Sequence, residues 1–168
     1  PKSPSREHFV ALKPSGRAAS IDVGRVRVGI ALCDPDGILA TPLATVLRQD
    51  SLQESVQVVL DQIAEFSITR FYVGLPLNLD GSNSSSANDA REFAAGLQAA
   101  VAVPVRLVDE RLTSTSAGAT LRAAGRDSRS QREVIDQVAA VLILEHALAI
   151  EARTEDFAGI DLQGESLE

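Results

Sequence analysis

Three acidic residues stand in surroundings where an unpaired carboxylate is costly. Asp22 lies inside the apolar run AASIDVG, Glu110 directly follows the run PVRLVD, and Asp136 lies within the apolar stretch VIDQVAAVLIL. A carboxylate buried in such a place must be paired, protonated or bound to a cation. Taken singly, each acid is explained by a partner arginine or by a backbone amide that it caps.

Taken together, the three acids also suit a metal site. Carboxylates without a neighbouring His or Cys are hard oxygen ligands, of the kind that Mg²⁺ or Mn²⁺ binds. Such a cluster can hold two divalent ions roughly 4 Å apart, an arrangement that supports in-line displacement at phosphorus. The residues alone leave both hypotheses open, structural pairing and metal binding.

Other catalytic schemes lack the residues that they need. The chain has two histidines, His8 and His146, and no nucleophile-elbow sequence, so it does not fit a Ser-His-Asp hydrolase. Its one cysteine, Cys33, permits neither an intrachain disulfide nor a cysteine zinc site, and we expect it to be a small packed residue. There is no Walker A sequence.

Periodicity predicts the elements that would position the three acids. Apolar runs separated by tight turns predict three antiparallel strands, and later segments alternate between helical spacing and short apolar runs. The expected strands are 18–24, 26–32, 38–47, 71–75 and 103–108, and the expected helices are 51–66, 87–101, 113–124 and 133–150. This order predicts an α/β fold with a mixed sheet and helices on its faces. Because the functional crevice of such a sheet lies at the carboxyl ends of its strands, we expect Asp22 and Glu110 there, with Asp136 on a sheet-facing helix.

The length of 168 residues fits a single domain. We expect a flexible basic arm over residues 1–17, one folded domain over 18–151 and an acidic C-terminal tail over 152–168. The net charge is −7, but six of the acids and only one base lie between Glu151 and Glu168. The rest of the chain is close to neutral, so the overall charge does not exclude a nucleic-acid substrate. No run approaches the ~20 apolar residues of a membrane span, and no membrane partner is expected.

Four motifs, SIDVGRVRVGIALCDPDG, YVGLPLNLDGSNS, VRLVDERLTS and VIDQVAAVLIL, follow one another along the chain. Together they resemble the YqgF/RuvX family of RNase H-like nucleases, from about Arg17 to Ala149. The resemblance implies an RNase H-like fold with a five-stranded sheet in the order 3-2-1-4-5. It also implies that Asp22, Glu110 and Asp136 form a catalytic triad that binds Mg²⁺ or Mn²⁺.

The resemblance further implies an activity and a set of partners. It indicates a cytoplasmic bacterial nuclease that processes the 5′ end of pre-16S rRNA, with a ribosomal particle as a further candidate partner. The alternative is a Holliday junction resolvase, and symmetric cutting of a junction calls for a homodimer, whereas a monomer suffices for trimming rRNA. In either case Asp22 would bridge two ions, with Glu110 helping to hold one and Asp136 the other.

Basic and polar residues near the acids are candidates for substrate contact. Two arginines lie in the hairpin beside Asp22, although Val26 replaces a lysine that the family often carries. A basic connection precedes the helix of Asp136, and the polar loop 78–86 follows a strand. The candidates are Arg25, Arg27, Asn78, Ser82, Arg126, Arg129 and Arg132. The alternatives are a solvated basic loop and a turn fixed by Pro76 and Gly81, and Arg111 is expected to form a structural ion pair.

Two rival functions use a similar sequence. An actin-like ATPase also carries an Asp-x-Gly hairpin, but it needs two such domains over roughly 300 residues, and this chain has one. A non-catalytic RNA- or ribosome-binding module is the other rival. The intact acids argue against it, and five Phe, one Tyr and no Trp leave few platforms for base stacking.

Overall fold

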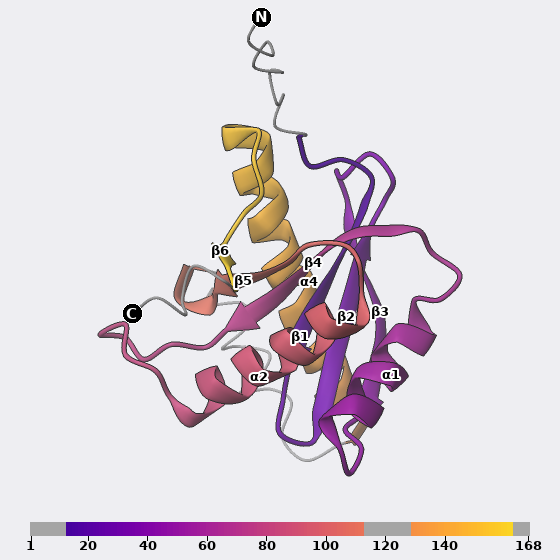
Figure 1. Cartoon of the computed structure of the whole chain (residues 1–168), viewed down its shortest axis with the longest axis vertical. Coiled ribbons are helices and arrows are strands. Elements are labelled where there is room, and N and C mark those ends of the chain that lie inside the picture. The colour runs from indigo at the N-terminus through magenta and orange to yellow at the C-terminus, as the bar shows by residue number, and fades with distance from the viewer. Residues whose placement is uncertain (1–12, 113–128, 163–168) are drawn as a thin grey trace, which may run out of the picture.

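A mixed β-sheet forms the centre of the fold (Figure 1). The structure is a computed structural model, and it describes residues 13–112 and 129–162. Within these residues the strands are β1 (Arg17–Val23), β2 (Arg27–Cys33), β3 (Ala40–Leu47), β4 (Ile68–Leu75), β5 (Val105–Asp109) and β6 (Ile160–Asp161). Their order across the sheet is β3-β2-β1-β4-β5-β6. Strand β1 is antiparallel to β2 and parallel to β4, and β5 is parallel to β4.

Helices cover the two faces of the sheet unequally. Helices α1 (Leu52–Gln62) and α2 (Ser85–Ala100) lie on one face, and the long helix α4 (Arg129–Thr154) lies on the other (Figure 1). Each face has its own hydrophobic core, because successive side chains of a strand point to opposite sides. In β1, for example, Ala19 and Ile21 belong to the core under α1 and α2, whereas Ala18 belongs to the core under α4.

Serine side chains begin the two helices on the first face. Ser51 accepts a hydrogen bond from the backbone N–H of Glu54 at 3.1 Å, and Ser84 accepts one from that of Ala87 at 3.0 Å. Both are N-caps, which satisfy amides that the first helical turn leaves without a partner.

The fold class and the order of the first five strands are confirmed, and β6 adds a sixth strand beside β5. Strand β3 begins at Ala40 rather than at residue 38, because the Asp34 carboxylate accepts the N–H groups of Ile38 and Leu39, each at 2.7 Å. Its pairing with β2 shifts in register between Ile30 and Ala31. The helix expected over 113–124 lies outside the described residues. None of the helices that are described is long and apolar enough to cross a membrane.

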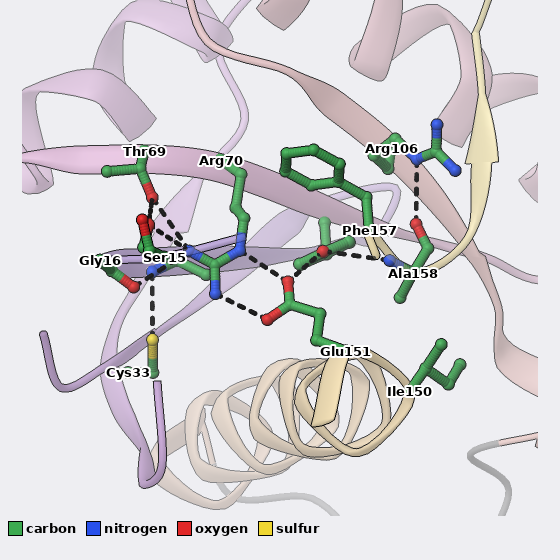
Figure 2. A network of polar contacts seen from close by, with 12 residues as sticks. Ser15, Gly16, Cys33, Thr69, Arg70, Arg106, Ile150, Glu151, Phe157 and Ala158 are labelled. Carbon is green, nitrogen blue, oxygen red and sulfur yellow. Dashed lines mark hydrogen bonds and ion pairs between the residues drawn. The ribbon is translucent and has the colours of Figure 1, made fainter. Parts of the chain in front are cut away.

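A buried polar network fixes the C-terminal end of α4 (Figure 2). The guanidinium of Arg70, only 1% exposed, donates two hydrogen bonds to the Glu151 carboxylate at 2.6 and 2.7 Å. It also donates to the carbonyl oxygens of Ser15 and Gly16, each at 3.0 Å. Burial alone would lower the pKa of Arg70, but the hydrogen bonds and the charge of Glu151, with smaller contributions from Tyr72 and Cys33, together raise it. The network therefore joins β4, α4 and the segment before β1.

The same network reaches the chain beyond α4. The Tyr72 hydroxyl donates a hydrogen bond to Glu151 and accepts one from the N–H of Ala158 at 3.2 Å. Burial and the bond to Glu151 raise the pKa of Tyr72. Helix α4 continues to Thr154, past the expected end at residue 150, and Ala158 is fully buried. The described part of the acidic tail therefore packs against the domain.

Cys33 is the small packed residue that the sequence predicts. It is buried at the end of β2, and its Sγ accepts a hydrogen bond from the backbone N–H of Ala18 at 3.1 Å. Burial raises the pKa of its thiol, which disfavours the reactive thiolate.

Candidate active site

All three acids lie on the α4 side of the sheet, at the edge where β1, β4 and β5 end. Ser20 of β1 faces α4, since its hydroxyl donates to the carbonyl of Ala140 at 2.5 Å. Asp22 is two residues further along the same strand and so points to the same side. In β5 the side chain of Val108 packs in the core under α4, and Glu110 follows two residues later.

Gly29 allows Asp136 to lie directly over the sheet. Gly29 of β2 is the residue paired with Asp22 of β1, and α4 crosses above it. A Cβ atom on Gly29 would come within 3.0 Å of the Asp136 backbone carbonyl and at 3.3 Å from the Asp136 Cβ. The missing side chain therefore lets helix α4 approach until Asp136 is next to the strand pair that carries Asp22.

Gly74 performs the same function for Glu110. It lies on β4, between β1 and β5, and is paired with Val108. A Cβ on Gly74 would meet an Oε1 of Glu110 and would come to 2.5 Å from Cδ1 of Ile143. The Glu110 carboxylate thus folds back over β4, toward the strand that carries Asp22. Two glycines, one on each side of β1, make room for two of the three acids.

Asp136 has an arginine partner in this structure. The Arg27 Nε donates to Oδ2 of Asp136 at 2.9 Å, and the side chains are 22% and 20% exposed, respectively. Arg27, expected to contact substrate, is therefore engaged with one of the three candidate acids. Of the two explanations that the sequence leaves open, the structure shows the ion pair for Asp136, and metal binding stays a prediction.

The acids fit a divalent cation in chemical type. All are hard oxygen donors on one side and at one edge of the sheet. As they are arranged, however, no group of three or more His, Cys, Asp or Glu among the described residues could hold a metal ion. Asp136 directs one of its oxygens to Arg27 instead. The fold brings the donors to the same place but does not close them into a ligand shell.

The other candidate contacts fall into three groups. Arg25 is exposed in the β1–β2 turn and donates to the Ser85 hydroxyl at 3.0 Å. Arg132 is exposed in the first turns of α4, and α4 begins at Arg129. Arg126 and the side chain of Arg129 lie outside what the structure describes. Asn78 and Ser82 bond to each other within their own turn, with Asn78 Nδ2 donating to the Ser82 hydroxyl at 3.0 Å.

Arg111 forms the expected structural ion pair, and its partner is Asp109. Its Nη2 lies 2.7 Å from Oδ2 of Asp109. The hydrogen bond from Arg111 lowers the pKa of Asp109, which stays ionised. Arg111 also donates to the backbone carbonyl of Leu79 at 3.2 Å, so it links the end of β5 to the loop after β4.

Arg48 is a positioning residue that sequence reasoning missed. It follows the end of β3, and its Nη1 donates to the Gly24 carbonyl at 3.3 Å and to Asp89 of α2 at 2.5 Å. The Arg48 guanidinium also lies over the ring of Phe93, 5.9 Å from its centroid. It therefore ties the turn of Arg25 to α2. The only signal in the sequence is a cation directly after a strand, which is too common to be diagnostic.

Known proteins share this fold. The structure of T. thermophilus RuvC in complex with Holliday junction substrate superposes with a TM-score of 0.51 at 17% identity, covering 83% of this chain and 96% of that one. The sheet order and this superposition show that the protein has an RNase H-like fold.

The sequence comparisons are more specific. The profile of the RuvX family, described as Holliday junction resolvase, matches residues 16–150, and the chain belongs to this family. A protein of Clavibacter sepedonicus named "Putative pre-16S rRNA nuclease" is 49% identical over 136 residues, which are 81% of this chain and 84% of that protein. A protein of the same name from Mycobacteroides abscessus is 50% identical over 131 residues, 77% of this chain and 79% of its own length. Members of such a family are hydrolases that act on phosphodiester bonds.

Proposed function

We propose that this nuclease cleaves precursor 16S rRNA at its 5′ end, in the cytoplasm where ribosomes are assembled. The observation that carries the proposal is the convergence of Asp22, Glu110 and Asp136 on one side and one edge of the sheet. The choice of RNA rests on the names of relatives that are about half identical to this chain over most of their length.

We propose that the three carboxylates hold divalent cations, Mg²⁺ or Mn²⁺. Asp22 lies on the strand between the other two acids and would bridge two cations, with Glu110 and Asp136 holding one each. A bound pair of such ions supplies an activated water and stabilises the leaving oxygen. Because Gly29 and Gly74 have no side chains, Asp136 and Glu110 can lie directly over the sheet.

Arginines at the edge of the site would orient the phosphodiester backbone. Arg25 and Arg27 flank the strand of Asp22, and Arg132 is exposed at the start of α4. Guanidinium groups bind phosphate oxygens in pairs, which fixes orientation as well as affinity. Arg126 and Arg129 would extend this basic edge. Asn78 and Ser82 would act indirectly, by holding the turn between them.

The test compares the protein with Asp22→Asn in Mg²⁺ and in Mn²⁺. The substrates are a fragment with the 5′ leader of pre-16S rRNA and a synthetic four-way DNA junction. We expect the leader to be cut and the rate to fall at least about a hundredfold in the variant, at an unchanged melting temperature. Asp61→Asn is the matched control, because Asp61 is exposed on α1, where its carboxylate accepts a hydrogen bond from Gln57 at 2.8 Å. Its rate should equal that of the parent protein.

Junction resolution is the second candidate, because the family profile is described by that activity. It predicts paired, symmetric nicks in the junction and a dimer in solution. If the folded protein binds the leader and cuts neither substrate in either metal, the chain is a binding module and the catalytic proposal is wrong.

A further inference from the structure

Helix α4 contacts the sheet through backbone carbonyl groups as well as through side chains. The Ser20 hydroxyl of β1 donates to the Ala140 carbonyl at 2.5 Å, and the Thr45 hydroxyl of β3 donates to the Glu133 carbonyl at 2.9 Å. Both carbonyls lie inside α4, where each also accepts the ordinary helical hydrogen bond from the residue four positions later. The two hydroxyl groups therefore make additional bonds, which the helix does not need for its own formation.

These two bonds lie on either side of Asp136. Glu133 precedes Asp136 by three residues and Ala140 follows it by four, a spacing that places all three on one face of the helix. Between the two bonds, the Asp136 carbonyl lies so close to Gly29 of β2 that no Cβ would fit there. Contacts along this face of α4 therefore reach β3, β2 and β1 in turn, with Asp136 in the middle.

The strands beneath these contacts also carry Asp22. Asp22, Gly29 and Thr45 form one row of paired residues across β1, β2 and β3, and paired residues share a face of the sheet. Ser20 precedes Asp22 by two residues and lies on the same face. The hydrogen bond from Ser20 to α4 thus joins the strand of Asp22 to the helix of Asp136, within four residues of each acid.

Apolar packing defines the position of α4 along its own axis less sharply than these bonds do. The core under α4 is rich in alanine, with four fully buried residues, Ala18, Ala31, Ala140 and Ala147. Burial of such small side chains is non-directional, so a short slide of the helix costs less than it would among large interlocking side chains. A hydrogen bond weakens steeply when its angle changes. The two hydroxyl groups therefore specify one axial position for the helix.

We propose that Ser20 and Thr45 are positioning residues for the metal site, which fix α4 along its axis and so set the distance between the carboxylates of Asp22 and Asp136. Each acts through the helix, because its hydroxyl is directed to a backbone carbonyl of α4. This inference rests on the proposed binding of divalent cations by the acids. It adds two uncharged residues that determine how tightly those cations are held.

The test measures Mn²⁺ binding by isothermal titration calorimetry, and urea midpoints, in variants that differ by one polar group. Ser20→Ala and Thr45→Val each remove a donor, and Thr45→Ser keeps it. Thr41→Val is the matched control, because Thr41 is on the same strand as Thr45 but its hydroxyl donates within the sheet, to the Leu32 carbonyl at 3.4 Å. Glu151→Gln is a second control, since it weakens the attachment of the opposite end of α4.

We expect Ser20→Ala and Thr45→Val each to raise the dissociation constant for Mn²⁺ about three- to tenfold, the effect of one lost hydrogen bond. Their urea midpoints should change little, because each helix carbonyl keeps its helical partner. Thr45→Ser and Thr41→Val should bind Mn²⁺ like the parent protein. Glu151→Gln should also do so, although it is less stable.

Two results would overturn the positioning inference and leave the metal proposal intact. One is parent-like Mn²⁺ binding by the double variant Ser20→Ala/Thr45→Val. The other is an equal weakening of Mn²⁺ binding in Glu151→Gln, which would attribute the effect to lost stability. A folded parent protein that binds no Mn²⁺ would overturn both the metal proposal and this inference.

Discussion

Arg27 and a divalent cation would compete for the same carboxylate. In the structure Arg27 occupies one oxygen of Asp136, and the acids are not closed around a common point. In this structure the Arg27 guanidinium balances the negative charge of Asp136. A bound cation would take over that role in the metal-loaded enzyme. Both side chains are about four-fifths buried, so this pair is screened less by water than a surface ion pair.

Replacing Arg27 should therefore make metal binding tighter. Arg27→Gln frees Asp136 without removing a ligand, and we expect the dissociation constant for Mn²⁺ to fall several-fold in isothermal titration calorimetry. Arg25→Gln is the matched control, since it removes the same charge from the same hairpin and Arg25 bonds Ser85. An unchanged or weaker affinity in Arg27→Gln, relative to Arg25→Gln, would contradict this competition.

At the scale of single residues, the sequence predicts where the acids lie in the fold, because strand alternation determines where a side chain points; their role stays a prediction. Asp22 follows Ser20, and Glu110 follows Val108, each by the two residues that return a chain to the same face. Sequence reasoning was less informative for the loop that follows β4. The bonds between Asn78 and Ser82 depend on the exact path of the turn, which residue types alone do not determine.

At the scale of elements, the site depends on how closely α4 lies on the sheet. Gly29→Ala would place a Cβ against the backbone of Asp136, which a rotamer change cannot relieve. We expect a loss of about 1–3 kcal/mol in the free energy of unfolding, together with weaker Mn²⁺ binding, because α4 must move away. Urea denaturation and calorimetry measure the two effects.

Gly96→Ala is the matched control for this substitution. Its Cβ would lie 3.1 Å from a methyl carbon of Leu52, a flexible side chain that can move, on the face covered by α1 and α2. It should leave Mn²⁺ binding unchanged. If both alanine variants bind Mn²⁺ like the parent, close approach of α4 is not what positions Asp136.

Sequence reasoning missed the elements that are too short to show a hydrophobic periodicity. Strand β6 has two residues, too few to show any period, and it forms only because the chain turns back beside β5. The acidic composition of the C-terminal segment also concealed Glu151, whose partner Arg70 comes just before the expected strand 71–75. Long periodic segments such as α1 and α2 were predicted well because their apolar positions repeat over several turns.

At the scale of the whole molecule, α4 connects two ends with different tasks. Asp136 lies near its start, at the edge of the sheet where the acids gather, and Glu151 lies near its end, in the network with Arg70 and Tyr72. Figure 2 shows how the Glu151 carboxylate meets Arg70 above the last turns of the helix. The end of α4 that carries Asp136 is held by close packing on Gly29, whereas the opposite end is held by the ion pair between Glu151 and Arg70.

Removing the charge of Glu151 should destabilise the whole fold. Glu151→Gln leaves the buried Arg70 guanidinium without its counter-ion, and we expect the free energy of unfolding to fall by about 3 kcal/mol. Glu155→Gln is the control, since Glu155 pairs with Lys13 at the surface and such a pair contributes at most about 1 kcal/mol. Equal urea midpoints for the two variants would show that the buried pair of Arg70 and Glu151 contributes no more stability than the surface pair of Lys13 and Glu155.

The two edges of the described sheet have a consequence for assembly. One edge is β3, where exposed Pro42 offers no N–H and the pairing with β2 shifts register; the other is β6, with two residues. Neither offers a long, regular row of backbone groups to a second chain, which protects a protein from growing into fibrils by strand addition. Two copies that came together on a four-way junction would therefore have to meet through helices or loops, and substitutions that prevent their association should be sought there.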